Sequence, residues 1–78
     1  MASRSQNERK FTSWEDLPGG GRRYVREFRG RAGGRALYIK EVDAAERTLR
    51  FTQEIYDASG RLTAIHEKFP VDLGHKKL

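Results

Sequence analysis

Basic and aromatic side chains that could bind single-stranded nucleic acid are spread over the middle of the chain. They are Arg29, Arg31, Tyr38, Lys40, Arg50 and His66. Cations neutralise backbone phosphates, and aromatic rings stack on unpaired bases, which is how many β-sheet surfaces bind single-stranded RNA or DNA. These side chains can act together only if the fold brings them to one surface.

The positive charge is concentrated in one segment. The net charge is +5, and residues 22–35 hold six arginines and a single glutamate, while charges balance in residues 1–21 and 36–78. Such a local excess favours anionic partners, although a basic surface that serves only solubility is commoner. Glu27 and Glu54 are expected on the same surface as the six candidate residues, where they would repel phosphates.

The sequence lacks the patterns of an enzyme or a metal site. A metal needs three or four converging ligands, whereas the chain has no cysteine and only two histidines, His66 and His75, nine residues apart. The glycines at 19–21 lack the lysine and hydroxyl residue that follow a phosphate-binding loop, so they are interpreted as a connector. We therefore expect a non-enzymatic binding protein with neither metal nor cofactor.

Four strand-like segments between Arg22 and Phe69 must position the candidate residues. Apolar residues alternate within them, and turns rich in glycine and aspartate separate them, as is typical of half-buried strands. The expected fold class is all-β with minor α, a four-stranded antiparallel meander. Its apolar face needs a cover, so the sheet is expected to half-close into a small barrel or to pair with a second copy.

Turn chemistry predicts how the four segments pair. A two-residue turn at Gly33–Gly34 pairs residues whose numbers sum to 67, so that Arg29 faces Tyr38. A bulged turn over Asp57–Gly60 pairs residues whose numbers sum to 118. Residues 43–47 contain no glycine, and there the apolar pattern favours a sum of 90.

These registers divide the side chains between two faces. The predicted buried face consists of Tyr24, Phe28, Leu37, Ile39, Leu49, Phe51, Ile55, Ile65, Phe69 and Val71. All six candidate residues fall on the opposite face, so the sequence predicts one basic, aromatic surface.

The N-terminal residues are predicted to lie outside the sheet. Residues 1–10 are polar and aperiodic and are expected to be a disordered tail, which leaves 11–78 as a single small β domain. Ser13 stands three residues before Asp16 in a capping arrangement that predicts a short helical turn ended by Pro18. Trp14 is expected to anchor this turn across the open apolar face or across one end of it.

The run Tyr56–Leu62 resembles one unit of the YD repeats found in large bacterial secreted toxins. Seven residues match, and the sequence has no second copy, whereas that family uses the motif in long arrays. Because the Asp57–Gly60 turn already explains the motif, the resemblance brings no function with it.

Two function classes remain. The leading hypothesis is a protein that binds RNA or single-stranded DNA through its basic, aromatic face. The alternative is a protein-interaction or homodimerisation module that uses an incompletely covered apolar face. No apolar run is long enough to span a bilayer and no cysteine is present, so we expect no membrane partner and a cytoplasmic location.

Overall fold

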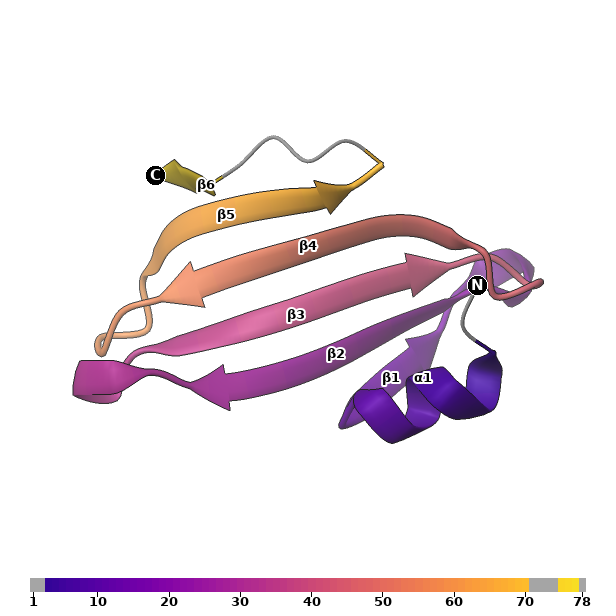
Figure 1. The fold of residues 1–78 in the computed structure, drawn as a ribbon, viewed down its shortest axis with the longest axis horizontal. Helices are drawn as coiled ribbons and strands as arrows, with labels where there is room; N and C mark the ends of the chain where they lie inside the picture. Colours follow the sequence, from indigo (N-terminus) through magenta and orange to yellow (C-terminus); the bar gives the residue numbers. More distant parts are fainter. Residues whose placement is uncertain (1–2, 71–74, 78) are drawn as a thin grey trace.

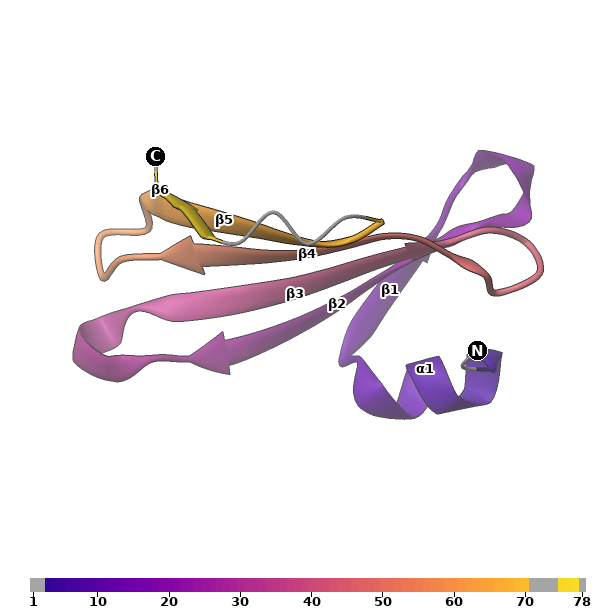
Figure 2. The same ribbon diagram turned by 45° about the horizontal axis from the view of Figure 1, so that its top comes forward.

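The computed structural model describes residues 3–70 and 75–77, with Arg31 and residues 75–77 described by their backbone only. The described elements are α1 (Arg4–Lys10), β1 (Ser13–Asp16), the 3-10 turn η1 (Pro18–Gly20), β2 (Arg22–Arg29), the 3-10 turn η2 (Arg31–Gly33), β3 (Arg35–Val42), β4 (Thr48–Tyr56), β5 (Leu62–Phe69) and β6 (His75–Lys77). The strands form one antiparallel sheet in chain order, with α1 against one end of it (Figures 1 and 2).

The predicted all-β meander is confirmed, and its details differ. The four predicted segments are β2 to β5, and β1 and β6 extend the sheet at its two edges. These two strands lie at opposite sides of an open sheet, so the predicted closure into a barrel is wrong (Figure 1). In the described part of the chain, no helix is long and apolar enough to cross a membrane.

The N-terminal segment differs from the sequence prediction. Residues 4–10, expected to be disordered, form α1, which a capping box begins: Ser3 Oγ accepts from the Gln6 N–H at 3.3 Å, and Gln6 Oε1 accepts from the Ser3 N–H at 2.9 Å. The expected helical turn at Ser13–Asp16 is instead the strand β1, in which Trp14 lies opposite Tyr24. Pairing with β2 thus outweighs the local capping pattern.

The turn between β2 and β3 is longer than the predicted two-residue hairpin. The Gly30 N–H donates to the Gly34 carbonyl at 2.7 Å, which leaves three residues in the turn. Ala32 (φ 56°) and Gly33 (φ 80°) adopt the left-handed conformation. Paired numbers therefore sum to 64 instead of 67, and this change from odd to even moves every β3 side chain to the other face relative to β2.

The turn between β3 and β4 is closed by a side chain. Asp43 Oδ1 accepts from the N–H groups of Ala45 and Arg47, both at 2.9 Å. Glu46 takes the left-handed position with φ 64°, although the sequence has no glycine there. Most paired numbers sum to 91, so Tyr38 lies opposite Gln53 instead of the predicted Thr52.

The turn between β4 and β5 has the predicted chemistry. Asp57 Oδ1 accepts from the N–H groups of Ser59 and Arg61, both at 3.0 Å, and Gly60 has φ 86°. The predicted register holds only beside the turn, where Tyr56 lies opposite Leu62. A bulge then shifts the strands by one residue, and the predicted register is wrong beyond it.

The observed registers place apolar residues on both faces of the sheet. We call one the aromatic face: Trp14, Arg22, Tyr24, Arg26, Phe28, Ala36, Tyr38, Lys40, Val42, Phe51, Gln53, Ile55, Ala64, His66, Lys68 and Phe69. We call the other the ion-pair face: Glu15, Arg23, Val25, Glu27, Arg29, Arg35, Leu37, Ile39, Glu41, Arg50, Thr52, Glu54, Ile65 and Glu67. The predicted buried set is thereby split between the two faces, and its member Val71 lies outside the described residues.

The best-buried residues lie where α1 covers the aromatic face. Tyr24 and Val42 are fully buried, and Phe11, just after α1, packs on the Tyr24 ring with a centroid distance of 5.5 Å. Trp14 also contacts Tyr24, at 6.0 Å, so it lies at one end of the aromatic face, which is one of its two predicted places. It does so from a strand and not from a helical turn, and it remains 42% exposed. The rest of the aromatic face is left open.

Candidate nucleic-acid interface

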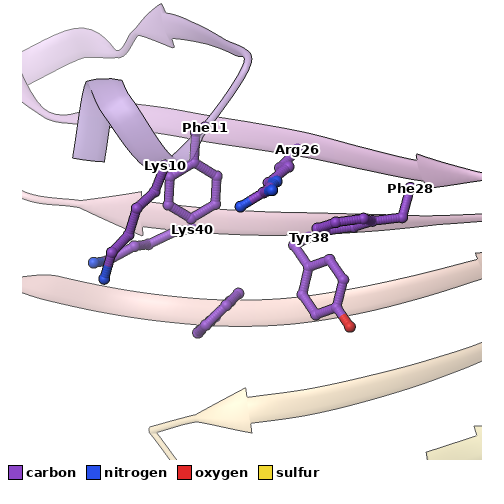
Figure 3. A pocket seen from close by; sticks show the side chains of 7 residues that line it. Lys10, Phe11, Arg26, Phe28, Tyr38 and Lys40 are labelled. Carbon is purple, nitrogen blue, oxygen red and sulfur yellow. The ribbon is translucent and has the colours of Figure 1, made fainter. Parts of the chain in front are cut away.

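A groove opens on the aromatic face beside α1, and its cavity volume is about 330 Å³. We call it the basic groove. It is lined by Lys10, Phe11, Arg26, Phe28, Tyr38, Lys40 and Phe51, which come from α1, the residue after it, and strands β2, β3 and β4 (Figure 3). The lining therefore consists of aromatic rings and cationic side chains alone among the residues that the structure describes.

The rings of the groove form a continuous cluster across three strands. Phe28 meets Tyr38 edge to face at a centroid distance of 5.3 Å, and Tyr38 meets Phe51 at 6.2 Å. The Tyr38 hydroxyl accepts from Gln53 Nε2 at 3.0 Å, which fixes the ring in place. Phe28 is 42% exposed, so a flat apolar surface is available to a base.

Cations stand directly over these rings. The Arg26 guanidinium lies 4.5 Å from the Phe28 ring centroid, and Lys68 Nζ lies 5.1 Å from the Tyr38 centroid and 5.9 Å from that of Phe51. Such contacts hold a cation by the ring's electrostatic field without neutralising its charge. The positive charges therefore remain available to an anion.

The groove contains no counterion from the described protein. Eight ion pairs join described side chains, and none of them includes Lys10, Arg26, Lys40 or Lys68. The positive potential of the groove is thus not cancelled locally, and it favours an anionic ligand.

The effect of this excess of positive charge is clearest at Lys40. Burial lowers the pKa of its ammonium group, and the positive charge of Lys10 lowers that pKa further, while the Glu46 carboxylate acts in the opposite sense without outweighing them. Figure 3 shows the Lys10 and Lys40 side chains extending in the same direction from α1 and β3. A phosphate near both amino groups would relieve their repulsion.

A buried polar cluster fixes α1 and hence one wall of the groove. Glu46 Oε2 accepts from Asn7 Nδ2 and from the Tyr24 hydroxyl, each at 2.9 Å, and Glu46 Oε1 accepts from Arg4 Nε at 2.8 Å. Lys40 Nζ donates to Asn7 Oδ1 at 2.9 Å. We call these five residues the helix anchor.

The charges of the helix anchor depend on one another. Burial alone would raise the pKa of the Glu46 carboxyl, but hydrogen bonds from Asn7, Arg4 and Tyr24 outweigh it and hold that pKa below its usual range. Burial raises the pKa of the Tyr24 hydroxyl, and its hydrogen bond to Glu46 raises it further. A charged Glu46 therefore joins α1 to β2 and, through Asn7, to Lys40.

The ion-pair face has the opposite arrangement of charges. Arg23 Nη1 lies 2.6 Å from Glu15 Oε1, and its Nη2 lies 3.4 Å from Glu41 Oε2. Arg50 Nε lies 3.2 Å from Glu67 Oε1. Carboxylates alternate with arginines along this face, so it offers no continuous positive surface to a phosphate backbone.

The structure divides the six predicted binding residues. Tyr38 and Lys40 line the basic groove, and His66 lies on the same face, opposite Gln53. Arg29 and Arg50 lie on the ion-pair face, so the prediction that they share a face with Tyr38 is wrong. The side chain of Arg31 lies outside the described part of the structure.

Sequence reasoning missed five of the residues that line the groove, Lys10, Phe11, Arg26, Phe28 and Phe51, and also Lys68, which lies over two of the rings. The helix that carries Lys10 could have been found, because the Ser3-to-Gln6 capping box marks its beginning. The place of the strand residues depends on the register, and no short motif marks them.

The described residues include no group of three or more His, Cys, Asp and Glu side chains arranged to hold a metal ion. Comparison of the chain with protein-family models, curated proteins and solved structures finds no significant match. The function must therefore be argued from the groove itself.

Proposed function

We propose that the protein binds single-stranded RNA or DNA in the basic groove. The observation that supports this most strongly is the combination of exposed rings with four cations that no described carboxylate neutralises. Bases would stack on Phe28, Tyr38 and Phe51, while the cations would contact the phosphates. Every base has a flat face that can stack on an aromatic ring, so we expect binding to depend little on the nucleotide sequence.

The proposal favours single strands over duplexes. The rings lie within a groove and can reach only bases that are not stacked in a helix, as in other aromatic sheet surfaces that bind RNA. Because both RNA and DNA expose such bases, the groove by itself accepts either. The lack of cysteine agrees with a reducing compartment, and we expect binding to take place in the cytoplasm.

A comparison of two charge-matched double variants tests the proposal. Arg26→Gln with Lys68→Gln removes two positive charges from the basic groove, and Arg23→Gln with Arg50→Gln removes two from the ion-pair face. Fluorescence anisotropy with a labelled oligouridine of about 12 nucleotides gives the dissociation constants at low salt. The groove variant is expected to bind about tenfold or more weakly, and the ion-pair-face variant to change by less than about threefold.

Salt dependence provides a second readout. A site in which three or four cations meet phosphates gives a slope of about −2 to −3 in log K against log salt concentration, and each lost contact reduces that slope by about 0.7. Equal weakening of both double variants would mean that net charge, not the groove, attracts the oligonucleotide. Failure of the unmodified protein to bind at low salt would reject the proposal.

Homodimerisation or binding of another protein is the second candidate function, and exposed apolar side chains favour it. Leu49 in β4 is 55% exposed, and Phe69 at the end of β5 is 41% exposed. Size-exclusion chromatography with light scattering, over a range of protein concentrations, measures self-association. A monomer at all concentrations that still binds oligouridine would leave nucleic-acid binding as the better-supported function.

A further inference from the structure

A second hollow lies at the end of the sheet away from α1, with a cavity volume of about 530 Å³. We call it the distal hollow. It forms where η2 meets the turn between β4 and β5, two turns that lie at the same end of the sheet in Figures 1 and 2. The turns are in close contact, since a Cβ atom added to Gly33 would lie 3.2 Å from the Ala58 Cβ.

A small residue between two large ones creates the apolar floor of the hollow. Ala36 lies opposite Phe28 on one side and opposite Ile55 on the other, and all three line the hollow. The Ala36 methyl group leaves between its neighbours a space that a flat ring could enter. A larger side chain at position 36 would fill that space.

The distal hollow adjoins the basic groove at Phe28. Phe28 lines both cavities and is 42% exposed between them. Lys40 in the groove and Ala36 in the hollow are four residues apart on the same face of β3, about 13 Å along the strand. That distance corresponds to about four stacked nucleotides.

The hollow is lined from both faces of the sheet, at its end. Phe28, Ala36 and Ile55 line it from the aromatic face, and Arg29, Arg35 and Tyr56 belong to the ion-pair face. The Arg35 guanidinium lies 5.0 Å from the Tyr56 ring centroid. Arg35 pairs with Glu27 at 3.4 Å, but both side chains are about half exposed, so water screens the pair and a phosphate could compete for the arginine.

One carboxylate, that of Asp57, lines the hollow among the described residues. Its Oδ1 already accepts hydrogen bonds from the Ser59 and Arg61 N–H groups and from the Ser59 hydroxyl, which direct it into the turn. These contacts hold its pKa below the usual range, chiefly through Ser59 and Arg61, so it stays ionised within the turn.

We propose that the distal hollow is a second base-binding subsite, which takes a downstream or upstream base of the same strand held in the basic groove. This inference rests on the proposed function and adds a path for the ligand, from α1 past Phe28 to the two turns. Phe28 then separates the two bound segments of the strand.

The variant Ala36→Leu tests this path by filling the hollow. Its affinity for labelled oligouridines of about two and about eight nucleotides, of which only the longer can span the groove and the hollow, is compared with that of the unmodified protein by fluorescence anisotropy at low salt. Ala45→Leu, which enlarges an exposed alanine in the turn at the opposite end of the sheet, is the matched control. Thermal unfolding of each variant, followed by circular dichroism, establishes that it folds.

The expected result is a loss of affinity of about fivefold or more for the longer oligonucleotide, with less than about twofold change for the shorter one. Arg35→Gln, compared with Arg47→Gln in the β3–β4 turn, should repeat this length dependence without changing the apolar floor. Equal effects of Ala36→Leu on both lengths, or no effect on the longer one in a folded variant, would overturn the inference. If the unmodified protein binds neither oligonucleotide, the proposed function itself fails.

Discussion

The two faces of the sheet carry similar numbers of cationic side chains, but these side chains have different neighbours on each face. On the ion-pair face, Arg23 and Arg50 each lie within 4 Å of a glutamate. On the aromatic face, Arg22 pairs with Glu8 and Asp16. Arg26 and Lys68, over the open part of that face, rest on rings and form no ion pair with a described side chain. The comparison shows that net charge alone does not locate a binding surface. What matters is whether each cation already has an anionic neighbour.

The faces also differ in how they contribute to stability. On the aromatic face, α1 encloses Tyr24 and Val42 completely, whereas Ile39 on the ion-pair face is only half buried. A chain of 78 residues has a small core, so losses at the enclosed positions should decide whether it folds. The open part of the aromatic face is left for a ligand.

The largest expected effect comes from the enclosed end of the aromatic face. Tyr24→Ala removes a fully buried ring that contacts Phe11, Trp14 and Glu46, and should reduce the free energy of unfolding by about 3–5 kcal/mol. Ile39→Ala on the ion-pair face should cost about 1–2 kcal/mol, because that side chain is half buried. Urea unfolding followed by circular dichroism measures both. Equal losses would contradict the view that the core lies under α1.

The second effect concerns the charge of Glu46. Glu46→Gln keeps the size of the side chain but weakens its hydrogen bonds to Arg4, Asn7 and Tyr24, at a cost of about 1–3 kcal/mol at neutral pH. Glu15→Gln, which removes an exposed ion pair from the other face, should cost less than about 1 kcal/mol.

The pH dependence of the stability tests whether the charge of Glu46 causes the loss in the Glu46→Gln variant. The pKa of Glu46 is lower in the folded than in the unfolded protein, so its contribution is fully present above the unfolded value near 4.5 and is lost as pH falls through the lower folded value. The Glu46→Gln variant should therefore lose less stability on acidification than the unmodified protein. Parallel pH profiles of the two proteins would show that Glu46 acts by packing alone.

The sequence was sufficient for the meander and for the turn between β4 and β5, but not for the turn at Gly33 or for the two faces. The chemistry of Asp57 and Gly60 predicted their turn correctly, because a local hydrogen bond and a left-handed glycine determine it. The turn at Gly33 failed because Ala32, an unexpected residue, also takes a left-handed conformation and lengthens the loop. That single difference moved Tyr38 to the face that carries Phe28.

The candidate site was predicted only where it did not depend on register. Tyr38 and Lys40 are neighbours in the groove, yet Arg29 and Arg50 were assigned to it only through registers that the structure corrects. Apolar residues occupy both faces of this sheet, so alternation could not tell which face is covered. The helix that covers one end was overlooked because its residues are polar.

The smallest expected effect is a change in oligonucleotide affinity at high pH, when Lys40 in the groove loses its charge. Because burial and Lys10 lower the pKa of Lys40 below the ordinary lysine value of 10.5, Lys40 should lose its proton at a lower pH than a lysine with that ordinary value. Binding of a single-stranded DNA oligonucleotide, which withstands alkali, should weaken by about two- to threefold over that range, as one partly screened contact is lost. Lys40→Arg keeps its charge and should abolish this early weakening, whereas Lys68→Arg should not. An unchanged profile in the Lys40→Arg variant would mean that phosphates do not approach Lys40, and would place the ligand nearer to Arg26 and Lys68 over the rings.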